Sequence, residues 1–142
     1  MIMEQFTLIF TTGLHYIAII PILQPYMNTK LPFFNLIYSL TIVAYVIFSS
    51  LYHYFSYLTS YAILFGLIDY IIIGLWFAQD VLWYFLLNKP LIIYLNVAVL
   101  ILHLCVMFTN NYVFYHSLCH VISAIKSWYI SSLIYLYDEK RI

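Results

Sequence analysis

The chain has 142 residues, of which 66% are hydrophobic, 21% aromatic and only 7% charged, and five acidic residues balance five basic ones. So few polar side chains cannot cover the surface of a soluble domain, and a mean hydropathy of +1.00 indicates an integral membrane protein. Zero net charge, the lack of a basic stripe and the lack of a glycine-rich phosphate loop argue against nucleic-acid and nucleotide partners.

At roughly 20 residues for each bilayer crossing, the length predicts one all-α transmembrane domain with about five spans. Apolar runs separated by proline, asparagine and polar turns predict these spans at residues 5–24, 33–57, 62–87, 91–108 and 112–137. Glu4 precedes the first run, where a cleaved signal peptide would carry basic residues, so we expect a retained helix. Asn88, Lys89 and Pro90 end the third run, because proline lacks the N–H that a continuing helix needs.

The loop and tail cations suggest an orientation. Alternating spans place all four of them on one side of the membrane: Lys30, Lys89, Lys140 and Arg141. By the positive-inside rule this side is cytoplasmic. We therefore expect the C-terminus in the cytoplasm and the N-terminus outside the cell or in a lumen.

Polar side chains interrupt three of the apolar runs at matching depth. Ser49 and His53 lie near the end of the second span, on the side of the membrane that holds the N-terminus. Asp69 lies roughly 10 Å into the third span, counted from the same side. His116 and His120 lie roughly 6 and 12 Å into the last span. Ionisable groups are costly in hydrocarbon unless they are paired or bind a metal, so this agreement predicts a functional site in one leaflet.

The spacing of the last two histidines favours metal binding. On a helix, residues four apart lie about 40° apart around the axis and about 6 Å apart along it, so both imidazoles can reach one point. A lone histidine inside a span more often bonds a backbone carbonyl or a neighbouring side chain, and we expect this of His15 and His103. Asp80 and Lys126 approach the cytoplasmic end, where we expect them to pair or to extend toward the surface.

Taken together, the polar residues resemble the three signature motifs of the CREST superfamily. This superfamily of seven-span membrane proteins holds the alkaline ceramidases, the progestin and adipoQ receptors and the bacterial hemolysin III proteins. The matching segments are Ser49-Ser50-Leu51-Tyr52-His53, Asp69-Tyr70 and His116-x-x-x-His120, on spans that make up about half of the chain. The motif wording is closer to the receptor and hemolysin III branch, whereas the expected outside N-terminus is more like the ceramidases, so the branch stays open.

The resemblance implies a zinc ion held by His53, His116 and His120, with water in the fourth position. In this superfamily such a site hydrolyses a lipid amide, as in ceramide, so the resemblance also implies a membrane lipid as substrate. Three protein ligands and one open position form the catalytic arrangement for zinc, which can lower the pKa of bound water to about 7. Asp69 would then act as general base, and Ser49 would hydrogen-bond the water or the developing oxyanion.

The chain departs from the superfamily in length, because it has room for about five spans and only 46 residues separate Asp69 from His116. Loss of two adjacent spans leaves the last helix starting on the same side, so the metal site can survive although the substrate pocket need not. A non-catalytic receptor or scaffold with a structural zinc site is therefore the alternative. A b-type haem carrier that uses His15 and His103 is a third hypothesis.

Two of the site residues have structural alternatives. Ser49 could donate a hydrogen bond to the carbonyl of residue 45 and only bend its helix. Asp69 could serve as the structural partner of a histidine rather than as a base. The sequence leaves both alternatives open.

Overall fold

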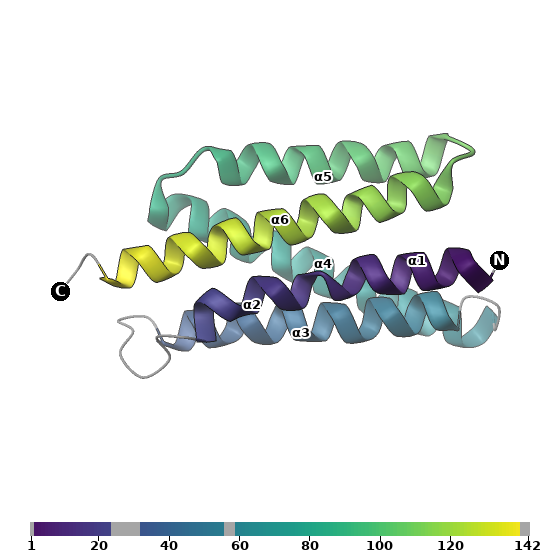
Figure 1. Cartoon of the computed structure of the whole chain (residues 1–142), viewed down its shortest axis with the longest axis horizontal. Helices are drawn as coiled ribbons and strands as arrows, with labels where there is room; N and C mark the ends of the chain where they lie inside the picture. The colour runs from purple at the N-terminus through teal and green to yellow at the C-terminus, as the bar shows by residue number, and fades with distance from the viewer. Residues whose placement is uncertain (1, 24–31, 56–58, 140–142) are drawn as a thin grey trace.

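The computed structural model describes residues 2–23, 32–55 and 59–139, and these form an all-helical bundle. The predicted all-α class is therefore confirmed. The helices are α1 (Ile2–Gly13), α2 (His15–Leu23), α3 (Pro32–Tyr54), α4 (Thr59–Leu87), α5 (Leu91–Phe108) and α6 (Tyr112–Glu139). They run lengthwise along one another, with the start of α1 at one end of the bundle and the end of α6 at the other (Figure 1).

Helix α6 is the centre of the bundle. It packs extensively against α2, α5 and α1, and along a shorter contact against α4. On the other side, α3 packs against α4, α1 and α2, so that α1 and α2 follow one another between α3 and α6 (Figure 1). Helix α5 rests mainly on α6 and contacts α4 much less, which leaves space between α4, α5 and α6.

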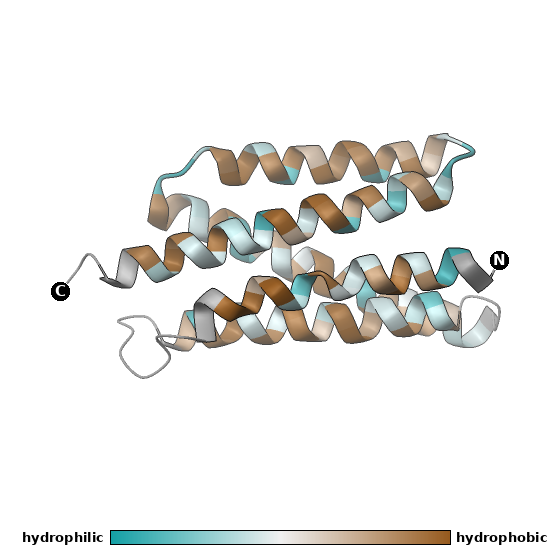
Figure 2. Ribbon diagram, viewed as in Figure 1, coloured by the Kyte–Doolittle hydropathy of each residue, from teal (hydrophilic) through white to brown (hydrophobic). Residues whose placement is uncertain are grey.

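In the described part of the chain, three helices are long and apolar enough to cross a membrane: Phe33–Tyr54, Ser60–Leu87 and Leu91–Phe108. They match the predicted second, third and fourth spans. Helices α1 and α2 are each shorter than a bilayer crossing, and α6 is long enough but more polar. Figure 2 shows this contrast between α5, which is largely hydrophobic, and α6, where hydrophilic residues recur. The polar residues in the middle of α6 all point inward, because Ser123, Lys126, Ser127 and Ser131 are buried.

The prediction of one continuous first helix over residues 5–24 is wrong, because the chain breaks at Leu14 between α1 and α2. The cause is competition for backbone acceptors. The Thr12 hydroxyl donates to the Leu8 carbonyl at 2.8 Å, a side-chain bond of the kind that bends helices. His15 donates from Nδ1 to the Thr12 carbonyl at 2.8 Å and so uses the acceptor that a continuous helix would give to the backbone N–H of Tyr16.

The predicted turn at residues 88–90 is present. Asn88 has a positive φ of 50°, the left-handed conformation in which asparagine commonly ends a helix. Of the cations that set the expected orientation, Lys89 is exposed in this turn. Lys30, Lys140 and Arg141 lie outside the described residues, and so does the end of the first predicted span at Gln24.

A buried polar network joins four helices in the interior. Lys126 of α6 forms an ion pair with Asp80 of α4, with Nζ and Oδ2 2.5 Å apart. Tyr38 of α3 donates to the other oxygen of Asp80 at 3.0 Å, and Lys126 also donates to the side-chain oxygen of Asn96 of α5 at 3.0 Å. The ammonium lies 4.7 Å from the ring centre of Trp76. The expected pairing of Asp80 with Lys126 is confirmed, and both residues are fully enclosed.

Candidate metal centre

Two helices bring three histidines together near one end of the bundle. His53 lies in the last turn of α3, and His116 and His120 lie four and eight residues after the first residue of α6. One ligand nitrogen from each ring lies within 4.8 Å of the other two. The ring centres are 4.8 Å apart for His53 and His116, 4.8 Å for His116 and His120, and 5.5 Å for His53 and His120.

The spacing of these nitrogens fits a tetrahedral metal ion. Nε2 of His53 and Nε2 of His120 are 3.3 Å apart. Zinc–nitrogen bonds of 2.0–2.1 Å at tetrahedral angles place two nitrogen ligands about 3.3 Å apart. Both side chains are buried, with 2% and 1% of their surface exposed, so water does not separate them. Three imidazoles are a donor set that suits zinc and also copper, iron and nickel. The group can therefore hold a metal ion.

Residues of α1 and α3 surround His120. The hydroxyl oxygen of Tyr45 lies 2.7 Å from its Nδ1. The hydroxyl oxygen of Thr12 lies 3.3 Å from Nε2 and 3.5 Å from Nδ1 and is thus nearly equidistant from the two ring nitrogens. Neither Thr12 nor Tyr45 was predicted from the sequence, although Tyr45 precedes His53 by two helical turns and so lies on the same face of α3.

Asp69 and two of the histidines share a cavity of about 530 Å³ between α4, α5 and α6, whose wall also includes residues of α3. This volume falls within the range of about 300–1,000 Å³ for small-molecule sites. His116, His120 and Asp69 line it together with mainly apolar and aromatic side chains. Asp69 is only 8% exposed, and its Oδ1 has no hydrogen-bond partner. A buried carboxylate oxygen without a donor is costly, so it is suited to receive a proton or a ligand.

Ser49 stands apart from this cavity. Its side chain is fully buried one turn before His53, and it is not among the residues that line the cavity. Its hydroxyl has no hydrogen-bond partner, so the expected alternative of a bond to the carbonyl of residue 45 is wrong. The structure thus places Asp69 in the wall of the cavity together with the two α6 histidines. Ser49 lies one helical turn before His53 and outside that wall.

The other two histidines of the spans flank the centre on different sides. His15 bonds the Thr12 carbonyl, as expected for a lone histidine, and its ring centre lies 6.2 Å from that of His120. His103 lines the cavity, and its ring centre lies 6.1 Å from that of His116. The two residues therefore approach different members of the cluster.

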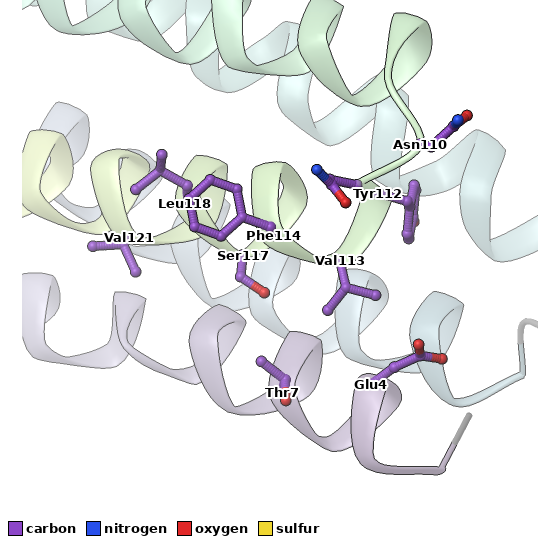
Figure 3. A pocket seen from close by; sticks show the side chains of 10 residues that line it. Glu4, Thr7, Asn110, Tyr112, Val113, Phe114, Ser117, Leu118 and Val121 are labelled. Atoms are coloured by element: carbon purple, nitrogen blue, oxygen red, sulfur yellow. The ribbon is translucent and has the colours of Figure 1, made fainter.

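A second hollow of about 780 Å³ lies between α1 and the start of α6, and Figure 3 shows Glu4 and Thr7 of α1 below the α6 residues that line it. The α6 residues Val113, Ser117 and Val121 follow one another at four-residue intervals. None of the three clustered histidines is among the residues that line this hollow, so it is separate from the histidine cluster.

Comparison of the chain with protein-family models, with curated proteins and with solved structures finds no match. The resemblance to the CREST superfamily is therefore carried by the motif residues alone, and the geometry of the site is the basis for any function.

Proposed function

We propose that the chain is a five-span membrane protein whose histidine centre binds Zn²⁺ and serves the hydrolysis of a lipid amide. One observation carries the proposal. Three imidazoles from two helices converge with their ligand nitrogens within 4.8 Å of one another, one pair of them at the 3.3 Å expected for two ligands of a tetrahedral ion, and two of the rings face a cavity that contains the unpaired carboxylate oxygen of Asp69.

Helix composition supports the five-span arrangement. Three helices have the length and apolarity of spans, and α4 and α5 expose many large apolar side chains along their outer faces. In a membrane, polar residues face the interior of the bundle, which agrees with the buried polar residues of α6. The short helices α1 and α2 then form one broken crossing along α3. Five crossings agree with the start of α1 and the end of α6 lying at opposite ends (Figure 1).

His53, His116 and His120 would hold the metal. When bound, zinc supplies a Lewis acid that polarises a carbonyl group and makes water more acidic. Asp69 has a buried oxygen without a donor in the same cavity, and we assign it the general base that accepts a proton from the attacking water. Ser49 lies one helical turn before His53 and outside the cavity lining, so its role as hydrogen-bond donor to this water or to the developing oxyanion is assigned on the basis of its motif alone.

The wall of the cavity suits a lipid. Most of its lining residues are apolar or aromatic, and the two helices α4 and α5 that contribute to its wall contact each other much less than α5 contacts α6. A lipid amide could enter from the surrounding membrane with its chain against Ile73, Phe77 and Leu100, while its polar group lies near Asp69 and His116. Apolar lining with a few convergent polar groups is the usual composition of a small-molecule site.

A second candidate function is a non-catalytic receptor or scaffold in which zinc only stabilises the fold. The position of the cluster favours it, because α3 and α6 are held apart over most of their length by α1 and α2. A metal bound by His53 of α3 and by the two histidines of α6 would link these helices directly. Zinc binding then stabilises whichever state of the protein presents its ligands.

Metal analysis of detergent-purified protein tests the centre. We expect about one zinc per chain in the wild type and markedly less in His53→Ala and His116→Ala. His103→Ala is the matched control, because this histidine lines the same cavity outside the three-histidine group, and it should keep its zinc. Equal zinc in all four proteins would remove the metal site.

Product analysis tests the chemistry. Mass spectrometry after incubation with ceramides and glycerolipids should show a free fatty acid and an amine from the amide only in the proteins that retain zinc. Zinc without any lipid product would favour the scaffold function over the hydrolase.

A further inference from the structure

Tyr45 makes a short polar contact with one of the three histidines, His120. Its hydroxyl oxygen lies 2.7 Å from Nδ1 of His120, and both side chains are buried. The tyrosine ring is confined, because its centre lies 4.9 Å from that of His15 and 4.9 Å from that of Trp76. The hydroxyl is thus held in place by packing as well as by the hydrogen bond.

The direction of this hydrogen bond decides whether His120 can bind a metal. A neutral imidazole carries one N–H, and its other nitrogen has the lone pair. If Tyr45 donated to Nδ1, the proton of His120 would sit on Nε2, which faces Nε2 of His53 at 3.3 Å. No lone pair would then point into the cluster. If Nδ1–H donates to the tyrosine oxygen, Nε2 is unprotonated and available as a ligand.

We propose that Tyr45 is a positioning residue of the metal centre: its hydroxyl oxygen accepts the Nδ1–H of His120 and so holds the tautomer and ring orientation that present Nε2 to the metal. This inference rests on the proposed zinc centre and deepens it. Metal-ligating histidines generally donate their second ring N–H to a fixed acceptor, and loss of that acceptor weakens metal binding. Nδ1 of His116 has no hydrogen-bond partner, so it lacks such an anchor.

The placement of Tyr45 also couples the helices that build the centre. Tyr45 and His53 are two turns apart on one face of α3, so α3 supplies one ligand and also orients a ligand of α6. The break between α1 and α2 places the His15 ring against Tyr45 and the Thr12 hydroxyl against His120. The hydrogen bond of Tyr45 therefore joins α3 to α6 at the point where α1 and α2 also meet them.

Zinc affinity of Tyr45→Phe, measured by competition with a chelator in detergent, tests this role. The substitution removes one oxygen and keeps the ring, and we expect an affinity loss of about 10- to 100-fold. Tyr38→Phe is the matched control, because Tyr38 is a fully buried tyrosine of the same helix whose hydroxyl bonds Asp80 instead. Its zinc affinity should equal that of the wild type even if the protein becomes less stable.

The outcomes separate this inference from the function on which it rests. A wild type that binds zinc and a Tyr45→Phe variant of equal affinity would overturn the role of Tyr45 and leave the metal centre intact. A wild type that binds no zinc would overturn both.

Nitrogen-15 NMR of histidine-labelled, zinc-loaded wild type gives an answer that does not depend on how the variant folds. The resonances of His120 are assigned by their loss in His120→Ala. A proton on Nδ1 of His120 supports the proposal, and a proton on Nε2 contradicts it.

Discussion

Replacement of Lys126 by methionine should strongly destabilise the protein. The substitution keeps a long apolar side chain but leaves the fully buried Asp80 carboxylate without its cation. The Tyr38 hydroxyl, at 3.0 Å, would still donate to that carboxylate, but a neutral donor does not replace the cation. Loss of one partner of a buried ion pair costs about 3–5 kcal/mol, because the remaining charge stays in a medium that does not solvate it. We expect a decrease of this size in the free energy of unfolding.

The double variant makes the cause identifiable. Asp80→Asn combined with Lys126→Met removes both charges, so the double variant should be less destabilised than Lys126→Met alone. Lys89→Met is the matched control, since Lys89 is exposed in the turn between α4 and α5 and its loss should change stability by less than about 0.5 kcal/mol. Denaturant titrations of the wild type, Lys126→Met, Asp80→Asn, the double variant and Lys89→Met in one detergent measure these differences. If Lys126→Met is no less stable than Lys89→Met, or if the two interior substitutions simply add, the ion pair does not contribute as argued.

Three further substitutions test the catalytic assignment and the packing beside the cavity. Asp69→Asn should abolish amide hydrolysis while zinc content stays at the wild-type level, and an unchanged rate of fatty-acid release, followed by mass spectrometry, would exclude Asp69 as the base. Gly74→Ala should stabilise α4 by up to about 1 kcal/mol, because the added Cβ meets nothing within 4 Å. Gly66→Ala should gain less in the same denaturant titration, since its Cβ would lie 3.2 Å from the Tyr52 ring, and an equal gain would show that this ring moves aside without cost.

Much of the helical framework could be predicted from the apolar runs and their breakers. The predicted range 91–108 coincides with α5, because Pro90 and the turn after Phe108 interrupt an otherwise uniform apolar run. The break at Leu14 could not be predicted in this way. It arises where Thr12 and His15 side chains compete for backbone carbonyls, and an apolar run shows no sign of such a competition.

The residues of the candidate site also fall into those that could be predicted from the sequence and those that could not. Counting residues along a helix gives the depth of a side chain, and the matching depths of His53, His116 and His120 correctly predicted that they could meet. Depth does not say which way a side chain faces or which helices are neighbours. For this reason Asp69 and Ser49 could be placed at one level from the sequence, although only Asp69 lines the cavity. Tyr45 could not be singled out from the sequence, because it is one of 16 tyrosines, most of which would suit a membrane interface equally well.

The polar composition of α6 follows from its position in the bundle. This helix supplies His116 and His120 to the histidine cluster and, six residues further along, Lys126 to the buried ion pair. At 1.5 Å per residue the two clusters stand about 9 Å apart along the same helix. A helix that serves both must carry polar residues on an inward face and therefore cannot match the apolarity of α4 and α5. The buried polar residues that make α6 less apolar than α4 and α5 are thus those expected of a central helix that contributes to both clusters.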